Sequence, residues 1–166
     1  MERLLVRGTL EQGRREAGAP VVARDSAGYE MVSGEIARSR AFVRDFLADA
    51  SSRHGLEVSD RAMDVAQLVV SELATNVCKY APGPCLLDLE ATEDSLDIVM
   101  WDSGAVLPAA SPADPARVGR HGLELVLMVC QSFSVHREPV GKRVRVRISL
   151  RDDPSGDPAG STVGQV

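Results

Sequence analysis

The segment from Asp60 to Tyr80 constrains the fold of this 166-residue chain more than any other part of the sequence. Its apolar residues recur at the spacing of one helix face and are Ala62, Ala66, Val69, Leu73 and Val77. Ser59 can cap the start of a helix, and the prolines of "APGP" at its end cannot continue one. The pattern predicts a single long helix with one buried face over residues 60–80.

Polar residues interrupt the end of this expected helix. The stretch "SELATNVCKYAP" carries Glu72, Asn76 and Lys79, whose spacing places them near one helix face. Burying such groups without partners costs about 1–3 kcal/mol for an amide and more for a charge. We therefore expect something polar to face them. The alternative is a solvated helix end with an incidental salt bridge, which contributes only about 0–1 kcal/mol.

The rest of the folded part combines helix and strand patterns. Apolar residues recur at helical spacing from Ile36 through Val43, Phe46 or Leu47 and Ala50, until Gly55 stops the helix. Strand composition marks four segments, which are 85–91, 95–102, 134–138 and 141–150. A helical pattern marks one further segment, residues 123–133. Grouped helices and hairpin-linked strands predict an α+β fold, with helices packed on one face of a mixed, mainly antiparallel sheet.

Composition divides the chain into an arm, a folded part and a tail. Residues 1–27 are rich in Gly, Arg and Glu without steady periodicity, which predicts a flexible N-terminal arm. The folded part, residues 28–151, starts with "YEMVSGEIA" as a short strand and is long enough for one domain with a core. Residues 152–166 are dominated by Pro, Gly, Ser and Asp and predict a disordered C-terminal tail.

Charge, hydropathy and cysteine usage argue against several classes of function. The net charge is −5, so the chain lacks the basic surface that direct binding of nucleic acid requires. The sequence has no signal-peptide pattern and no stretch near the roughly 18 apolar residues that cross a bilayer, so we expect a cytoplasmic protein. The three cysteines are widely spaced and odd in number, which argues against both a disulfide framework and a zinc site.

Two short motifs follow the expected long helix. In "MWDSGAVLP", Asp102 falls at the end of a strand, where its carboxylate can accept hydrogen bonds from an amino group, and Gly104 lets a ligand approach the backbone. In "GRHGLELV", Gly119 and Gly122 flank the start of the next helix, whose free N–H groups attract phosphate. Each motif alone is equally typical of a turn or an ordinary loop.

Together and in this order, the three motifs resemble those of the GHKL ATPase superfamily, which includes gyrase, MutL, histidine kinases and bacterial anti-sigma-factor kinases. "SELATNVCKYA" is similar to the N box of that superfamily, "DSGAVLP" to its first glycine box and "GRHGL" to its second. The resemblance runs from about Ser33 to Leu150. It is closest to the stand-alone anti-sigma-factor serine/threonine kinases, which share the "SELATN" form and a preceding helix, here "ARSRAFVRDFLAD".

The resemblance implies the Bergerat ATP-binding fold, with ATP and Mg²⁺ as cofactors. Asn76 would bind Mg²⁺ through its side-chain oxygen, Glu72 would be the general base, and Lys79 would neutralise phosphate. Asp102 would accept from the adenine amino group, which selects adenine over guanine, and Gly104 would leave room for the base. Further residues would border the lid and contact the phosphates: Gly119, Gly122, Arg117, Arg120 and His121.

Two positions depart from the family pattern. Val106 stands where the pattern D-x-G-x-G has its second glycine, and a left-handed backbone there would cost a β-branched residue more than about 1–2 kcal/mol. Nucleotide affinity or lid closure is therefore the property that this change would affect. Arg143 follows the "GK" of the last strand, where the family often has a small hydroxyl residue.

The last expected strand, "GKRVRVRISL", alternates basic and apolar residues. Period two predicts one buried face with Val144, Val146 and Ile148 and one basic face with Arg145, Arg147 and either Lys142 or Arg143. The basic face is either solvated or a docking patch for an acidic partner.

Three functions are compatible with these motifs. The first is a protein serine/threonine kinase that phosphorylates an anti-sigma antagonist protein and sequesters a sigma factor. The second is a nucleotide-binding switch with little turnover, which Val106 motivates. The third, a histidine-kinase catalytic domain, is less favoured because no upstream helical hairpin carries a phosphorylatable histidine, and His54 lies beside a helix-stopping glycine. Relatives often dimerise, so a homodimer is also allowed.

Overall fold

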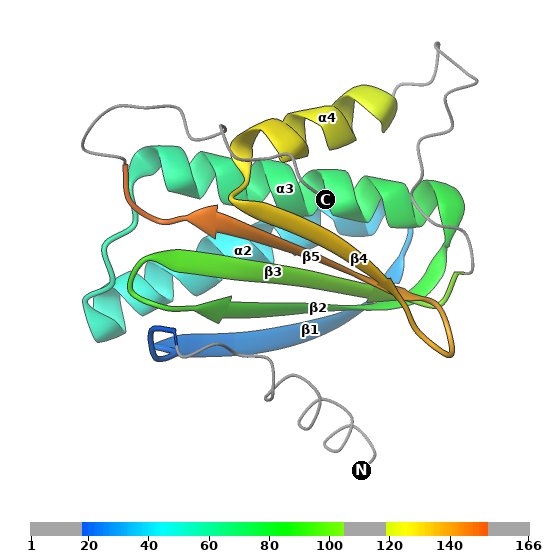
Figure 1. The fold of residues 1–166 in the computed structure, drawn as a ribbon. Coiled ribbons are helices and arrows are strands. Elements are labelled where there is room, and N and C mark those ends of the chain that lie inside the picture. Colours follow the sequence, from blue (N-terminus) through cyan, green and yellow to red (C-terminus); the bar gives the residue numbers. More distant parts are fainter. Residues whose placement is uncertain (1–17, 105–118, 153–166) are drawn as a thin grey trace.

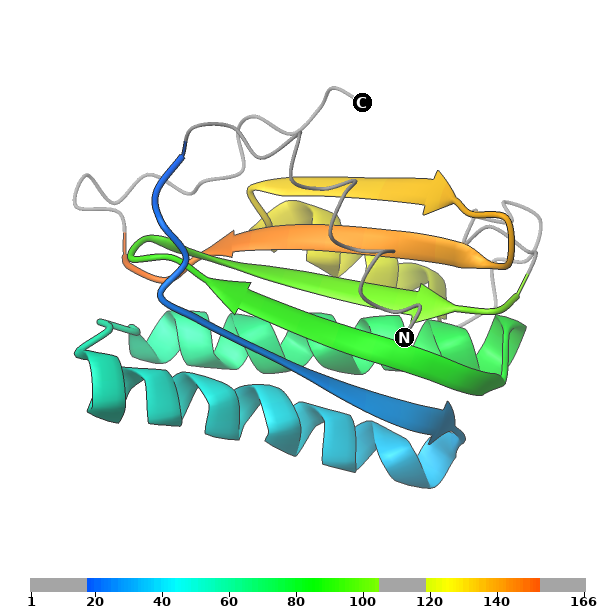
Figure 2. The same ribbon diagram turned by 90° about the horizontal axis from the view of Figure 1, so that it is seen from below.

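The computed structural model describes residues 18–104 and 119–152, with side chains from residue 122 onward in the second range. Three helices cover one face of a five-stranded sheet, and the other face looks away from them (Figures 1 and 2). In chain order the elements are β1 (Ala23–Met31), α2 (Ser33–His54), α3 (Asp60–Tyr80), β2 (Gly83–Ala91), β3 (Ser95–Asp102), α4 (Gly119–Val129), β4 (Ser132–Arg137) and β5 (Lys142–Ser149).

The sheet has the strand order β1-β2-β3-β5-β4. All four pairings among the described strands are antiparallel. The α+β fold and the mainly antiparallel sheet are therefore confirmed. The described strands form no parallel pair, so this part of the sheet is not mixed. The β2–β3 hairpin turns at Thr92, whose backbone N–H donates to the carbonyl of Ser95 at 2.9 Å. The β4–β5 hairpin places the last strand between β3 and β4.

Helix α3 has the bounds that the sequence predicted, Asp60–Tyr80. The Ser59 hydroxyl accepts from the backbone N–H of Ala62 at 2.9 Å, as expected of an N-cap. All five residues of the apolar stripe are buried against the sheet and the neighbouring helices. Helix α2 ends at Gly55, whose φ of 67° is left-handed and suits glycine.

The helix-facing side of the sheet forms the core. Alternate residues of β2, β3 and β5 are buried there, and both Phe46 and Leu47 of α2 pack against them. Transfer of such apolar surface from water is the main favourable term in folding. The sheet residues concerned are Leu87, Leu89, Ala91, Leu96, Ile98, Met100, Val144, Val146 and Ile148.

Two boundaries differ from the sequence expectation. Strand β1 begins at Ala23, before the boundary of 28, because it is an edge strand whose polar residues can face water while the backbone pairs with β2. Helix α4 ends at Val129 instead of residue 133, because Phe133 pairs with Val146 in the β4–β5 ladder. The expected arm up to residue 17 and the tail from residue 153 lie outside the described residues. None of the described helices is long and apolar enough to cross a bilayer.

Candidate functional site

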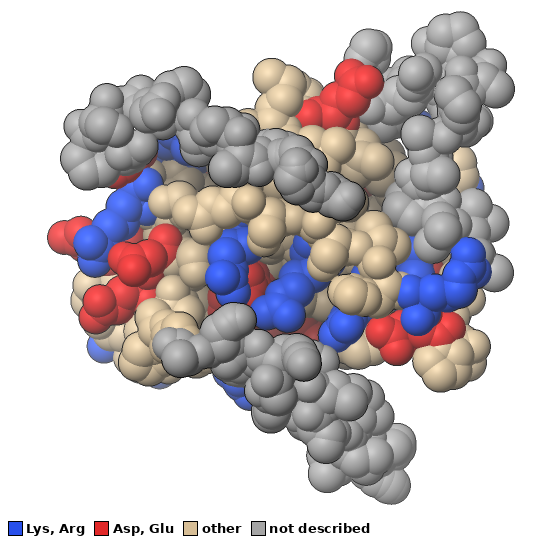
Figure 3. All heavy atoms as spheres, viewed as in Figure 1, with Lys and Arg blue, Asp and Glu red and all other residues tan. Residues whose placement is uncertain are grey.

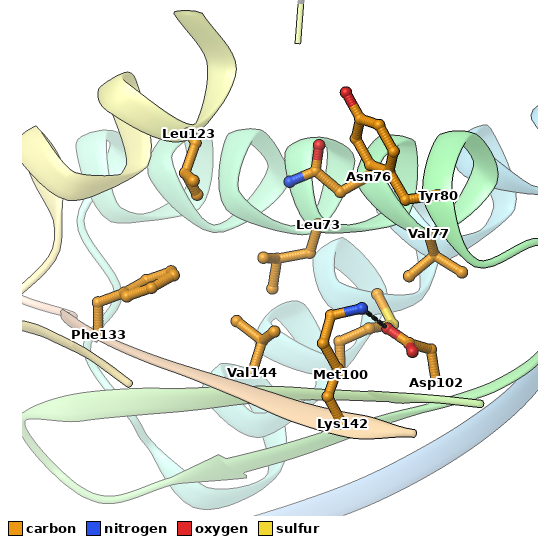
Figure 4. Close-up of a pocket in the computed structure, with 10 residues that line it drawn as sticks. All are labelled: Leu73, Asn76, Val77, Tyr80, Met100, Asp102, Leu123, Phe133, Lys142 and Val144. Carbon is orange, nitrogen blue, oxygen red and sulfur yellow. Dashed lines mark hydrogen bonds and ion pairs between the residues drawn. The ribbon is translucent and has the colours of Figure 1, made fainter. Parts of the chain in front are cut away.

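A small cavity lies between α3, the start of α4 and the ends of three strands (Figure 4). Its volume is about 10 Å³, roughly what one water molecule needs. The wall is mostly apolar, and a carboxylate, an amide and an ammonium converge on it. The lining residues are Leu73, Asn76, Val77, Tyr80, Met100, Asp102, Leu123, Phe133, Lys142 and Val144.

The cavity brings together two residues that the sequence placed in separate motifs. Asn76 reaches it from α3, and Asp102 reaches it from the end of β3. Both sides of the cavity are fixed by the core, since the flanking residues Leu73 and Val77 of α3 and Met100 of β3 are buried. The N-box segment and the first glycine-box segment therefore share one site.

Glu72 lies one helical turn before Asn76 and faces the start of α4. A Cβ atom added to Gly122 would lie 1.7 Å from Oε1 of Glu72 and 2.5 Å from its carboxyl carbon. A side chain at this position would require the Glu72 carboxylate to shift, so the absence of a side chain at Gly122 is what allows this contact. The two motifs that carry Glu72 and Gly122 are thus in direct contact.

The most buried charges of the site are Asp102 and Lys142. They lie directly opposite each other in the β3–β5 register, and they are 6% and 5% exposed. Nζ of Lys142 donates to Oδ2 of Asp102 at 2.7 Å (Figure 4). The backbone N–H of Gly104 donates to Oδ1 at 2.8 Å. Both carboxylate oxygens of Asp102 therefore already accept one hydrogen bond.

Sequence reasoning left Lys142 as a possible member of the basic face, whereas the structure places it in the site. The alternation of side chains along the strand indicates this position of Lys142. Val144, Val146 and Ile148 define the buried face, and Lys142 lies on the same face because it is two residues before Val144. Gly141 sets the entry into this strand. Its φ is 86°, and an added Cβ would lie 1.7 Å from the carbonyl oxygen of Asp102.

Comparison with known proteins assigns the family. The model for the "Histidine kinase-like ATPase domain" matches residues 32–148, more than half of the chain. The chain belongs to the histidine kinase-like ATPase family. The GHKL superfamily and an ATP-binding regulatory role follow from this, and domains of the family bind ATP, usually with Mg²⁺. No match was found among curated proteins.

The cavity of this ATPase domain fits a nucleotide in its chemistry. Apolar side chains from α3, β3 and β5 can pack on the faces of a base, and Asp102 can accept from a polar edge. Within the described residues, no group of three or more His, Cys, Asp or Glu side chains could hold a metal by itself. A magnesium ion would thus rely on the Asn76 oxygen together with phosphate and water. The enclosed part of the cavity, about 10 Å³, is smaller than a base.

The remaining candidate residues of the ATPase domain are less closely tied to the cavity. Lys79 is exposed on α3. Gly104 was expected to leave room for the base. The structure adds another reason for a glycine, because a Cβ atom added to Gly104 would lie 2.3 Å from the Cβ atom of Ala81. Gly119 lies at the first position of α4. The side chains of Arg120 and His121, and the whole of Arg117 and Val106, lie outside the described part.

The opposite face of the sheet carries the expected basic row. Arg143, Arg145 and Arg147 lie there, and Figure 3 shows basic and acidic side chains interspersed over this face. Arg145 and Arg147 both bond Asp97, at 2.7 Å and 2.8 Å, and Arg143 stacks over the Trp101 ring at 5.3 Å. These arginines are therefore engaged within the sheet, and whether the face docks a partner stays a prediction.

Burial changes the titration of one thiol beside the site. It raises the pKa of the Cys85 thiol to about 11, with the negative charge of Asp102 as the next cause. Cys85 lies opposite Asp102 in the β2–β3 register. The thiol therefore stays neutral at physiological pH and adds no negative charge beside the carboxylate.

Proposed function

We propose that this protein binds Mg-ATP in the cavity and transfers the γ-phosphoryl group to a serine or threonine of an anti-sigma antagonist protein. The observation that supports this best is the convergence of Asn76 and Asp102 on one cavity, with Glu72 one helical turn before Asn76 on α3. A carboxylate, an amide oxygen and a base-reading acid come from two elements of the fold, with Gly122 closing over the carboxylate.

Each residue has a defined task in this proposal. The Asn76 side-chain oxygen would hold Mg²⁺, which neutralises phosphate charge. Asp102 would accept from the base. Glu72 would take the proton of the attacking hydroxyl. The hydroxyl oxygen bonds to the γ-phosphorus, the bond between that phosphorus and the β–γ bridging oxygen breaks, and ADP leaves.

A nucleotide-binding switch is the second candidate, and the closed cavity favours it. In the described structure Gly122 of α4 lies against Glu72, and Leu123 lines the cavity. A nucleotide that enters beside these groups would alter their contacts, and the switch candidate expects α4 to change position as a result. A partner that recognises this helix would then sense the nucleotide without turnover.

Ligand-induced stabilisation tests the nucleotide site that both candidates share. Saturating Mg-ATP should raise the free energy of unfolding by about 2.7 kcal/mol at a hundredfold excess over Kd. Asn76→Ala should abolish most of the part of this stabilisation that depends on magnesium. Gln67→Ala is the matched control, because it removes another half-buried amide of α3, whose Nε2 donates to the Met63 carbonyl outside the site. No stabilisation of the wild-type chain would rule out both candidates.

Phosphotransfer separates the two candidates. The full chain is incubated with γ-labelled Mg-ATP and an anti-sigma antagonist from the same genome. The kinase proposal expects label on serine or threonine in the wild type and its loss in Glu72→Gln, with Mg-ATP binding retained. Binding without any labelled product supports the switch. Acid-labile self-labelling contradicts both and indicates histidine-kinase chemistry.

A further inference from the structure

The buried pair beside the cavity has hydrogen-bonding capacity that its contacts with the described residues leave unused. An ammonium has three N–H donors, and Lys142 directs one of them to Asp102. Each oxygen of Asp102 accepts one bond and can accept a second. Both residues line the cavity, and Figure 4 shows the ammonium and the carboxylate side by side there. The pair therefore presents a donor next to an acceptor to a ligand that enters the cavity.

We propose that Lys142 is a second base-reading residue, whose ammonium donates to N1 of adenine while Asp102 accepts from the N6 amino group. This inference rests on the proposed nucleotide site. On its Watson–Crick edge, adenine carries a donor at N6 and, next to it, an acceptor at N1. A carboxylate only accepts, and an ammonium only donates. The pair thus matches both groups of the adenine edge in a single orientation of the base.

The same pair rejects guanine at two positions of the base edge. Guanine has an acceptor at O6 where adenine has its N6 donor, and a donor at N1 where adenine has an acceptor. In the orientation that suits adenine, O6 would face the Asp102 carboxylate and N1–H would face the Lys142 ammonium. Both contacts join groups of the same kind, and buried polar groups left unmatched give strong discrimination. Lys142 therefore adds to the selection of adenine by Asp102.

The backbone holds the Lys142 ammonium at a fixed place beside the carboxylate. Lys142 and Asp102 are direct partners in the β3–β5 register, and both are buried. The turn before Lys142 passes so close to β3 that a Cβ atom added to Gly141 would lie 1.7 Å from the carbonyl oxygen of Asp102. A donor that is already in place costs less conformational entropy when the base binds.

A purely structural ion pair is the alternative role for Lys142. Buried ion pairs are often no more stabilising than apolar side chains of similar volume. Val144, two residues further on the same strand and face, is a buried apolar residue that also lines the cavity. Stability alone therefore gives no reason for a cation at position 142. A structural pair would also be indifferent to the atom at position 1 of the base, and this difference can be measured.

ATP analogues that lack one ring nitrogen test the inference on the wild-type chain. In 1-deaza-ATP a C–H group replaces N1, and in 7-deaza-ATP a C–H group replaces N7, which lies outside the Watson–Crick edge. We expect the magnesium complex of 1-deaza-ATP to bind the full chain about 10- to 100-fold more weakly than Mg-ATP, because the ammonium loses its acceptor. Mg-7-deaza-ATP should bind like Mg-ATP. Equal Kd values for ATP and 1-deaza-ATP, or equal weakening by both analogues, overturn the inference.

The variant Lys142→Met assigns this loss to the ammonium. It should bind ATP more weakly than the wild type does, and it should bind ATP and 1-deaza-ATP alike, because the donor that distinguishes them is gone. Arg145→Met is the matched control on the other face of β5, since it also removes a cation 2.7 Å from a β3 carboxylate. It should keep the wild-type preference for ATP over 1-deaza-ATP. A preference that persists in folded Lys142→Met overturns the inference, and if this variant does not fold, the analogues on the wild-type chain decide.

Mg-GTP gives a second measurement and separates this inference from the proposed function. GTP should bind the wild type at least about 100-fold more weakly than ATP, and this ratio should fall in Lys142→Met. GTP binding as tight as that of ATP, or an unchanged ratio in the folded variant, overturns the role of Lys142 and leaves the nucleotide site in place. Failure of ATP itself to bind the wild type overturns the proposed function.

Discussion

The β3–β5 strand pair carries one ion-paired carboxylate on each face of the sheet, and the two are built differently. On the helix-facing side, Asp102 meets Lys142, and the two residues are 6% and 5% exposed. On the open side, Asp97 meets Arg145 and Arg147, whose side chains are 37% and 46% exposed. The shortest N–O distance is 2.7 Å in both cases.

The difference between the faces lies in how completely each carboxylate is satisfied. Burial by itself would raise the pKa of Asp97, but hydrogen bonds from Arg147 and Arg145 outweigh it and lower the pKa below its ordinary value. On the open face, two partly exposed arginines bond the single carboxylate of Asp97. Asp102 has one cation, sealed beside a cavity. The open face thus favours stability, and the helix-facing side keeps capacity for a ligand.

Removing the carboxylates should reveal this difference most strongly. Asp102→Ala leaves the Lys142 ammonium buried without a partner, so we expect the free energy of unfolding to fall by about 3–5 kcal/mol. Asp97→Ala leaves two arginines that can turn to water, and we expect a loss of about 1–2 kcal/mol. Urea unfolding of both variants provides the measurement. Equal losses would contradict the distinction between the faces.

Gly141→Ala should have the next largest effect, because this glycine positions Lys142. The left-handed backbone costs a side chain about 1–2 kcal/mol, and the new Cβ would collide with the Asp102 backbone. We expect a loss of at least about 2 kcal/mol by urea unfolding. Gly28→Ala on β1 is the control, since its nearest neighbour would be 3.9 Å away. Similar stabilities of the two variants would mean that the turn adapts.

Acid titration should then isolate the open face. The folded pKa of Asp97 is lowered, so the unfolded state binds more protons as the pH falls below the ordinary value of 3.8. The stability that Asp97 contributes is fully present above that pH and is lost as the pH falls through the folded pKa. The difference between wild type and Asp97→Asn in urea unfolding should accordingly be smaller at about pH 3 than at about pH 6, with the loss confined to pH values below about 4. A difference that grows in acid would contradict the lowered pKa of Asp97 in the folded state.

The smallest change in stability is expected when the site-side pair is replaced as a whole. Asp102→Leu combined with Lys142→Met removes both charges, and apolar replacements of buried pairs are often neutral or stabilising, so we expect a change within about 1 kcal/mol. Mg-ATP should no longer raise the melting temperature of this variant. Retained stabilisation by Mg-ATP would show that neither charge contacts the base.

Local patterns were sufficient for the main elements of the fold. The bounds of α3 and β3 agree with the sequence prediction, because each element has a strong period of its own. The edge strand β1 and the end of α4 could not be placed as well. Their limits depend on pairing with residues of β2 and β5 that are distant in the chain.

The sequence by itself determined the helical spacing that aligns Glu72 and Asn76, and the motifs that assign the chain to its family. Only the tertiary structure decided that Gly122 lies against Glu72 and that Lys142 pairs with Asp102 beside the cavity. Helical and strand periods arise within a few residues of chain. Contacts between α3 and α4, or across β3 and β5, depend instead on strand register and packing, which sequence spacing does not encode.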